Sequence, residues 1–414
     1  MTSARSEVTM AGKGGRPHVL VVGGGIGGFT TALACARRGM SVHVLERAPE
    51  IKEIGAGLQL GPNAGRVLSE LGVLNSVLRT AVLPERFVIL DAYTGRELYE
   101  AQFGWELAER FGAPYTVMHR ADLLDALLEG SLSTGLVKAS IGKEVVGVEQ
   151  NARGATVTCA DGSSHSADVV VGADGLRSAV RRLVLDDSEP VVSRYVIYRG
   201  PGPRPEGVED AVTLYAGDGL HLMQYPIHGG ELLNRVASFR SDRGEPGSDT
   251  WGTPEELFEK FADACDPVQE ALRNLDLGKR WEQFDRRPMA GWAQGRIALL
   301  GDAAHPMRQY LAQGAGQAME DAVALAAALA DAPDDPVTAL KEYEEVRFPR
   351  ASAVQHNTRF FGEMVHLGGV GAVLRDFAFR SLQRNDYTLA EWLYGTGGAP
   401  APQPPARLDV YAEV

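Results

Sequence analysis

Short runs of consecutive hydrophobic residues recur along this chain, and each leads directly into a glycine-containing segment. The first run, residues 18–22, reads His-Val-Leu-Val-Val and is typical of a strand buried on both faces of a parallel sheet. We expect a helix from about Ile26 to Arg38, ended by Gly39, and then a second strand from Ser41 to Leu45. This order predicts a strand–helix–strand unit of an α/β fold.

Buried strands of the same kind are expected further along the chain. Ala167 to Val171 and Arg296 to Leu300 are both hydrophobic runs that end in a Gly-Ala-Asp or Gly-Asp segment. The alanine-rich residues 322–330 are expected to be helical. The α/β pattern therefore spans most of the chain.

A different pattern occupies residues 75–105 and 183–285. Hydrophobic and polar positions alternate in these stretches, for example from Val212 to Tyr215 and from His221 to Tyr225. Alternation of this kind is typical of strands with one exposed face. A second, mixed sheet is therefore expected, inserted into the first unit.

Composition narrows the class of protein. With 414 residues, the chain suits two interleaved domains with a binding crevice between them. Acidic residues outnumber basic ones, 54 against 41, and the formal net charge of −13 argues against nucleic acid or an anionic membrane as partner. Any anion must therefore bind in a local, built pocket.

Cysteine usage and the chain ends add further expectations. Cys35, Cys159 and Cys265 lie far apart, without the paired spacing of a zinc site or a disulfide framework, so we expect no metal site and a reducing, cytoplasmic location. No uninterrupted run of about eighteen hydrophobic residues occurs in the sequence, so no membrane span is predicted. Residues 1–16 are expected to be a loose start and residues 396–414 a flexible tail.

Glycines after the first strand form a dinucleotide-binding motif. Gly23, Gly25 and Gly28 satisfy G-x-G-x-x-G, in which the backbone turns tightly, approaches a pyrophosphate and packs the helix against the strand. The helix that begins at Ile26 offers its amides to the phosphates, and Glu46, at the end of the second strand, is placed to bind a ribose diol. The motif by itself leaves NAD, NADP and FAD open.

Two later motifs decide between these dinucleotides, because they resemble the signatures of the flavoprotein hydroxylases. Residues 172–181, Gly-Ala-Asp-Gly-Leu-Arg-Ser-Ala-Val-Arg, resemble the Asp-Gly fingerprint of that family, through Asp174. Residues 301–306, Gly-Asp-Ala-Ala-His-Pro, resemble its second FAD motif, in which the aspartate, here Asp302, contacts the flavin ribitol. A chance Asp-Gly turn and a helix-capping aspartate are the structural alternatives.

The resemblance implies further contacts to the cofactor. Gly314, Ala315 and Gly316 would place free amides and a helix N-terminus against the flavin pyrimidine, where negative charge accumulates on reduction. Arg120, in a His-Arg-x-x-Leu segment, corresponds to an arginine that reaches FAD. The same resemblance assigns three more positions to the cofactor site: Ile26, Arg47 and Val145.

The chain is thus similar to the single-component FAD-dependent aromatic hydroxylases of the para-hydroxybenzoate hydroxylase fold. Within them it resembles 3-hydroxybenzoate 6-hydroxylase and salicylate hydroxylase, through residues 55–63 (Gly-Ala-Gly-Leu-Gln-Leu-Gly-Pro-Asn), 198–200 (Tyr-Arg-Gly) and 221–226 (His-Leu-Met-Gln-Tyr-Pro). The implied fold class is α/β, with a Rossmann-like FAD-binding domain, an inserted mixed-sheet substrate domain and a C-terminal helical region. The predicted FAD-binding domain comprises residues 17–74, 106–182 and 286–395, the last with the C-terminal helices. The substrate domain comprises residues 75–105 and 183–285.

The family chemistry implies two cosubstrates besides the aromatic substrate. NADH or NADPH reduces the flavin, and O2 then forms a flavin hydroperoxide that hydroxylates an electron-rich, phenolic acid-like ring. Because only one G-x-G-x-x-G unit is present, the nicotinamide nucleotide has no domain of its own. The resemblance also allows a homodimer.

Three residues are the candidates for catalysis, because a phenol reacts well only when it is ionised. His221 is the expected base, because the unperturbed pKa of histidine is about 6.5, and it matches the catalytic histidine of the 3-hydroxybenzoate 6-hydroxylase pattern. Gln309 would orient the substrate hydroxyl, and Tyr225 would line the pocket or bond a carboxylate. Each of the three has core packing as its structural alternative.

Two neighbouring residues receive other interpretations. His305 is expected to shape the turn beside the flavin, with Pro306, and not to be catalytic. Arg308 stands where relatives often have a small or apolar residue, and is either a surface arginine or a partner for a substrate acid or for the phosphate of the nicotinamide nucleotide.

Other functions remain as alternatives at this point. A secondary-metabolite epoxidase or hydroxylase would share the cofactor cycle. A flavin halogenase is disfavoured, because Gly291-Trp292 continues as Ala-Gln-Gly and not as the Gly-Trp-x-Trp-x-Ile-Pro of halogenases. A nicotinamide-dependent dehydrogenase or a non-catalytic nucleotide-binding protein would need the first motif only, and would leave the other two unexplained.

Overall fold

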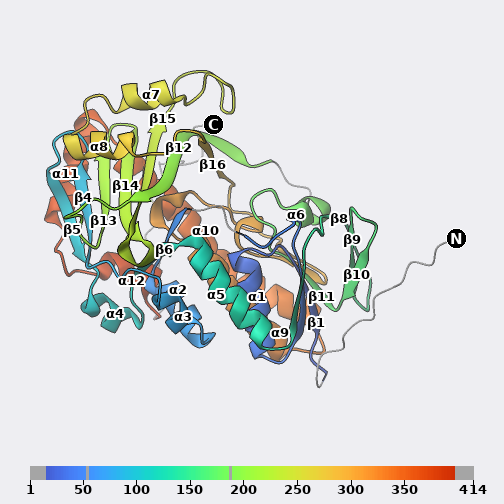
Figure 1. The fold of residues 1–414 in the computed structure, drawn as a ribbon. Coiled ribbons are helices and arrows are strands. Elements are labelled where there is room, and N and C mark those ends of the chain that lie inside the picture. Colours follow the sequence, from blue (N-terminus) through green and yellow to red (C-terminus); the bar gives the residue numbers. More distant parts are fainter. Residues whose placement is uncertain (1–14, 53–55, 186–188, 397–414) are drawn as a thin grey trace.

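The structure is a computed structural model that describes residues 15–52, 56–185 and 189–396. The loose start and flexible tail expected from the sequence lie almost entirely outside the described residues. Figure 1 shows two sheets, one at the upper left and one at the lower right, with α10 (Pro336–Val365) between them.

Six strands among the described residues form the first sheet, around β1. Across the sheet the order is β17 (Ala293–Gln294), β18 (Ile297–Leu299), β11 (Val169–Gly172), β1 (His18–Val22), β2 (Ser41–Leu45) and β7 (Val137–Ser140). All pairs are parallel except β17 with β18. Every residue of β1 and β2 is buried, because helices pack against the sheet.

The expected strand–helix–strand unit is confirmed. The strands over residues 18–22 and 41–45 have the expected bounds, and the helix, α1 (Ile26–Arg37), ends one residue earlier than expected. Gly39 follows with φ +82°, a conformation that glycine adopts without strain. Its amide donates to Ala36, which closes the last turn.

The strand expected over residues 167–171 is shifted. Ala167 ends β10 (Ser164–Ala167), and the buried strand β11 begins only at Val169. Asp168 separates the two strands, because its carboxylate accepts the His18 amide at 2.7 Å and its own amide donates to His18. The strand expected over residues 296–300 is confirmed with shorter bounds, as β18.

Seven strands in the described part of the chain form the second sheet. Their order is β16 (Trp281–Asp285), β12 (Val191–Pro203), β15 (Leu232–Arg240), β14 (Leu220–Ile227), β13 (Ala211–Gly217), β4 (Arg86–Asp91) and β5 (Glu97–Gln102). The sheet is mixed, since β13 pairs with β4 in parallel and the other pairs are antiparallel. All of its strands come from the two alternating stretches of the sequence.

Smaller elements complete the described chain. Two further sheets contain β3 (Gly57–Leu60) with β6 (Thr116–His119), and β8 (Val145–Gln150), β9 (Ala155–Cys159) and β10. The remaining helices are α2 (Pro62–Glu70), α3 (Leu74–Leu78), α4 (Trp105–Phe111), α5 (Arg120–Ser133), α6 (Ala179–Val184), α7 (Pro254–Lys260), α8 (Asp266–Arg273), α9 (Gly314–Asp331), α11 (Gly369–Ser381) and α12 (Thr388–Tyr394). Three short 3₁₀ helices are η1 (His228–Gly230), η2 (Gly301–Ala303) and η3 (Gln309–Leu311).

Separate hydrophobic cores support the two sheets. The larger core joins the first sheet to α1, α5 and α9, and a second core joins one face of the second sheet to α7 and α8. The opposite face of that sheet packs against the C-terminal helices, for example Val354 of α10 near Tyr225. The predicted domain bounds stay a prediction, and the bound between residues 74 and 75 falls inside α3.

Candidate active site

One continuous cavity of about 1140 Å³ extends from the first sheet to the second. It is lined by residues of all three sequence motifs and by residues of β14, α10 and the C-terminal helices. Seven basic side chains line it against five acidic ones, which reverses the balance of the whole chain. This is the local basic pocket that the acidic composition required for an anion.

The glycine loop leaves open backbone on the cavity side. A Cβ at Gly28 would lie 1.9 Å from the Gly23 carbonyl oxygen, and a Cβ at Gly23 would lie 2.4 Å from that of Ala173. Both positions therefore need glycine for close packing. A Cβ at Gly25 would meet nothing within 4 Å, and Gly25 lines the cavity together with Gly23 and Ile26.

Glu46 lies beside this loop, and two backbone amides hold its carboxylate in position. It accepts hydrogen bonds from the amides of Gly24 at 2.7 Å and Ala48 at 2.8 Å. Each carboxylate oxygen has a second lone pair, so the group keeps acceptor capacity for a ribose hydroxyl. Arg47, Val145 and Arg120 also line the cavity.

The second motif, residues 172–181, connects the cavity wall to the third motif. Asp174 lines the cavity, but its carboxylate accepts from the Ser178 hydroxyl and from the amides of Ala179 and Val180, where it caps α6. Arg181 is buried and donates to the carbonyls of Ala303 and Ala304, both at 2.8 Å. The second motif thus holds the third in place.

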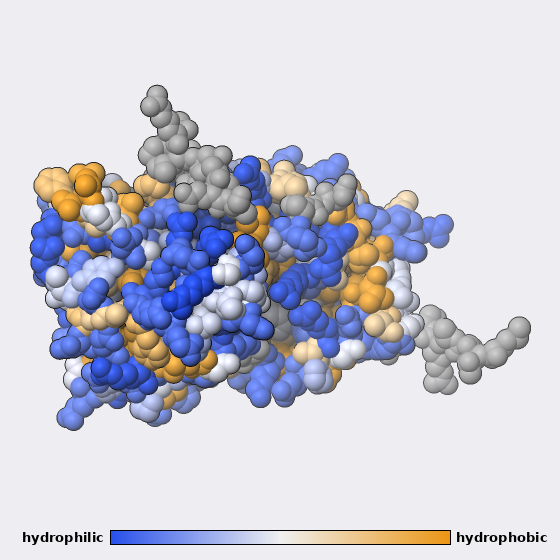
Figure 2. All heavy atoms as spheres, turned by 90° about the horizontal axis from the view of Figure 1, so that it is seen from above, coloured by the Kyte–Doolittle hydropathy of each residue, from blue (hydrophilic) through white to orange (hydrophobic). Residues whose placement is uncertain are grey.

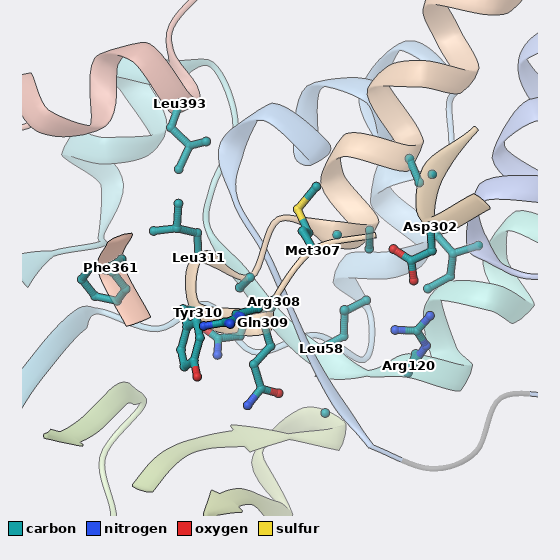
Figure 3. Close-up of a pocket in the computed structure, with 18 of the residues that line it drawn as sticks. Leu58, Arg120, Asp302, Met307, Arg308, Gln309, Tyr310, Leu311, Phe361 and Leu393 are labelled. Atoms are coloured by element: carbon teal, nitrogen blue, oxygen red, sulfur yellow. The ribbon is translucent and has the colours of Figure 1, made fainter. Parts of the chain in front are cut away.

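The third motif places Asp302 on the cavity wall. Figure 3 shows Asp302 and Arg120 near one end of the cavity, and Arg308, Gln309 and Tyr310 near the other. Helix α9 begins at Gly314, as the sequence predicted, and Gly314 and Ala315 line the cavity. The N-terminus of α9 therefore faces the cavity close to Asp302, whose Oδ1 would lie 3.9 Å from a Cβ at Gly314.

Two predicted cofactor residues do not line the cavity. Gly28 packs α1 against the loop, in the packing role that the motif assigns to its last glycine. Gly316 is buried beside Asn63 and Gln313, each 3.2 Å from the position of a Cβ. The residues that do line the cavity provide bare glycine backbone, a helix N-terminus, acids for hydroxyl groups and basic side chains for a diphosphate, and so they fit FAD.

His221 lies on β14 at the other end of the cavity. Its side chain is buried, and burial lowers its pKa to about 4. The pKa is thus well below the unperturbed value near 6.5, because a buried imidazolium loses its hydration. The imidazole Nδ1 lies 2.8 Å from Nε2 of His366, which follows the last residue of α10.

Gln309, Tyr225 and Arg199 also line the cavity. The side-chain nitrogen of Gln309 is buried and has no partner within the described residues. Tyr225 is buried, which raises the pKa of its phenol, and the guanidinium of Arg199 lies close enough to oppose that shift. Arg199 also lies over the Trp281 ring, with 4.4 Å between the guanidinium carbon and the ring centroid.

The structure also shows the partners of Arg308 and His305. Arg308 is buried and forms ion pairs with Asp285 and Glu363, both at 3.1 Å, so the surface interpretation is wrong. His305 is buried and hydrogen-bonded to Asp321 at 2.5 Å, which supports the expected role in shaping the turn.

Comparisons with known proteins agree with this geometry. A family model described as an FAD binding domain matches residues 16–358. The 3-hydroxybenzoate 6-hydroxylase 1 from Aquipseudomonas alcaligenes is 40% identical over 384 residues, which cover 91% of this chain and 97% of the relative. The chain belongs to this family of FAD-dependent aromatic hydroxylases. A second relative, 3-amino-4-hydroxybenzoate 2-monooxygenase from Streptomyces platensis, is 38% identical over 394 residues, which cover 93% of this chain and 97% of that relative.

Solved structures resemble the hydroxylase over most of its length. A salicylate hydroxylase substrate complex has a TM-score of 0.77 at 27% identity and covers 95% of the hydroxylase and 99% of that chain. A variant of HpxO from Klebsiella pneumoniae in complex with FAD has a TM-score of 0.79 at 28% identity, with 89% and 95% covered. The expected fold class is confirmed. Within the described residues, no helix is long and apolar enough to cross a membrane.

The sequence interpretation missed Arg199, which lines the cavity, and His366, which contacts His221. No role was predicted for Arg199, although a basic residue within a strand pattern is a signal for a binding site. His366 gave no signal, because a single histidine at the end of a long helix has no motif around it. Only the folded chain brings His366 to His221.

Proposed function

We propose that this hydroxylase uses NADH or NADPH and O2 to hydroxylate an aromatic ring that carries a phenolic hydroxyl and a carboxylate. The observation that carries the proposal is one continuous cavity, which is lined by the glycine loop and also by His221, Gln309, Tyr225 and Arg199. Bound FAD, reduced by the nicotinamide nucleotide, supplies the activated oxygen. The relatives named for 3-hydroxybenzoate and 3-amino-4-hydroxybenzoate support a substrate of this class.

The protein groups around His221, at what we call the substrate end of the cavity, would bind and ionise the phenol. His221 would contact the phenolic oxygen and favour its ionised form, which is the form that attacks an electrophilic oxygen. The unpartnered amide nitrogen of Gln309 would donate a hydrogen bond that orients the same oxygen. A substrate hydroxyl would thereby satisfy a buried donor that the protein leaves unpaired.

The carboxylate would bind at Arg199 and Tyr225. Arg199 is a cation within the cavity, and its planar guanidinium suits a carboxylate better than a point charge does. Tyr225 keeps its phenolic proton, because burial raises its pKa, and can donate it to the carboxylate. Arg308 is less suited to this role, since Asp285 and Glu363 already neutralise it.

Product analysis with labelled oxygen gas tests the proposal. We expect incorporation of one labelled oxygen atom into 3-hydroxybenzoate, 3-amino-4-hydroxybenzoate or salicylate, each offered with NADH and with NADPH. His221→Ala should lower hydroxylation by about a hundredfold or more while FAD remains bound. Stimulated NAD(P)H oxidation without hydroxylation of any phenolic acid would contradict the proposed substrate class and favour a larger, secondary-metabolite acceptor.

We also propose that the hydroxylase forms a homodimer through α11. Val370, Val373, Leu374 and Phe377 lie at helical spacing on one face of α11, and each is at least 65% exposed. A self-complementary apolar helix face suits a two-fold interface.

The thiols of Cys35, Cys159 and Cys265 are free, which supports a reducing, cytoplasmic location.

A further inference from the structure

Two buried histidines from distant parts of the chain share one hydrogen bond at the substrate end of the cavity. Nδ1 of His221 and Nε2 of His366 lie 2.8 Å apart, the ring centroids are 5.0 Å apart and the ring planes differ by 24°. These values fit two rings joined edge to edge through their nitrogens. Nε2 of His221 is on the far side of its ring, and no described residue is its hydrogen-bond partner.

His366 is held firmly enough to orient a neighbour. Its ring stacks on Tyr195 of β12, with centroids 4.4 Å apart and planes 16° apart. Its carbonyl accepts the Gly219 amide at 3.0 Å, which fastens the turn between β13 and β14 to the end of α10. His221 is the second residue of β14, so the same contacts fix both rings.

The shared bond allows only one proton between the two facing nitrogens. Burial lowers the pKa of both imidazoles, and the pKa of His366 is lowered further by His221, Arg308 and Arg375. Both rings are therefore neutral at neutral pH, and each has one N–H and one bare nitrogen. Either His221 donates through Nδ1 or His366 donates through Nε2.

The burial of His366 Nδ1 favours His366 as the donor. If His221 donated, His366 would carry its proton on Nδ1, which is buried and has no partner among the residues that the structure describes. An unpaired buried N–H is costlier than an unpaired acceptor nitrogen. The positive charges of Arg308 and Arg375 lower the pKa of His366 further and so keep its ring neutral, and the nearby rings of Tyr195 and Tyr310 are neutral phenols whose pKa is raised by burial.

We propose that His366 is a positioning residue that donates its Nε2 proton to His221 and fixes His221 with its own proton on Nε2. His221 then presents a hydrogen-bond donor to the cavity and stabilises the phenolate of the substrate, rather than removing a proton from the phenol. The phenol loses its proton to water as it binds. This inference rests on the proposed phenolic substrate for its consequence, but not for the tautomer.

Nuclear magnetic resonance of the holoenzyme with isotope-labelled histidine tests the tautomer without any substrate. We expect the parent protein to show His221 protonated on Nε2 and bare on Nδ1. His366→Gln, whose amide can donate at the same position, should retain that state, whereas His366→Leu should give a mixture of both tautomers. His356→Gln, on the same helix but outside the cavity lining, is the matched control and should change nothing.

A second measurement tests what the tautomer does. The ultraviolet difference spectrum of 3-hydroxybenzoate bound to the oxidised holoenzyme reports the fraction of ligand bound as phenolate. His366→Leu should lower the apparent ionisation constant of the bound phenol by about tenfold, and His366→Gln should largely restore it. His221 protonated on Nδ1 in the parent, or equal phenolate fractions in the parent and His366→Leu, would overturn the inference. Failure of 3-hydroxybenzoate to bind would count against the proposed substrate and would leave the resonance experiment to decide the tautomer.

Discussion

Two aspartates that look equivalent as motif residues have different surroundings in the folded chain. Asp174 uses its carboxylate on a hydroxyl and two amides at the start of α6, so little of it is left for a ligand. Asp302 is exposed on the wall of the cavity, near Arg120 (Figure 3). At the scale of single residues, we therefore propose that Asp302 binds the cofactor and that Asp174 supports the local structure.

Asp302→Ala should weaken FAD binding by about tenfold to a hundredfold, because it removes one acceptor for a hydroxyl group of the cofactor. Fluorescence titration of the apoprotein with FAD measures the change, and Asp302→Asn, which keeps an acceptor oxygen, should lose less. By contrast, Asp174→Ala should lower the unfolding temperature. An unchanged FAD affinity of Asp302→Ala would contradict the assignment.

His221 should make the protein less stable as the pH falls below neutrality. Its pKa is about 4 in the folded state and about 6.5 when unfolded, so between these values only the unfolded chain takes up the proton. The free energy of unfolding should fall by roughly 2 kcal/mol between pH 7 and pH 5 from this ring alone, and His366 acts in the same direction. Urea unfolding at the two pH values measures the loss, which should be smaller in His221→Gln; an equal loss in both proteins would exclude His221 as its source.

At the scale of elements, α9 and α10 are joined beneath the third motif by a buried network of charges. Asp321 accepts from His305, from the Gly301 amide at 3.0 Å and from Arg347 at 2.7 Å. Burial alone would raise the pKa of Asp321, but His305 and Arg347 outweigh it and lower the pKa to about 2. The network therefore fixes the turn that carries Asp302.

Asp321→Asn should cost about 3–5 kcal/mol of stability, because it leaves Arg347 buried without its partner at that position. Chemical unfolding measures the loss. The exposed pair of Arg38 and Glu70 provides the control, and Glu70→Gln should change the free energy of unfolding by less than about 1 kcal/mol. Similar losses in both variants would show that burial does not set the strength of the Asp321 network.

At the scale of the whole molecule, the surface seen in Figure 2 is largely hydrophilic and is interrupted by separate hydrophobic patches. The exposed face of α11 is such a set of apolar side chains. A net charge of −13 opposes close approach of two copies, so an interface needs apolar contact of this kind.

Phe377→Glu should convert a dimer into a monomer, because it places a charge at the centre of the α11 face. Size-exclusion chromatography with light scattering measures the mass. Val346→Glu, a change at another exposed apolar residue on α10, should leave the dimer intact. A monomeric parent protein, or a dimer that survives Phe377→Glu, would refute the α11 interface.

The sequence by itself determined the cofactor and the fold class. The glycine loop, the strand ends and the start of α9 are local features, in which a few neighbouring residues and the backbone geometry of glycine set the structure. The first two strands therefore have the bounds expected from hydrophobic pattern alone. The third strand was misplaced by two residues, because Asp168 bonds to His18, 150 residues away, and no local pattern records that contact.

Only the tertiary structure decided how the substrate end is arranged. The pKa of His221 depends on its burial, and its tautomer depends on His366, 145 residues further along the chain. Likewise, the burial and ion pairing of Arg308 depend on Asp285 and Glu363, which come from a strand and a helix that meet only in the folded protein. Desolvation and hydrogen bonding act through space, so the chemistry of this end was decided by packing rather than by the motifs.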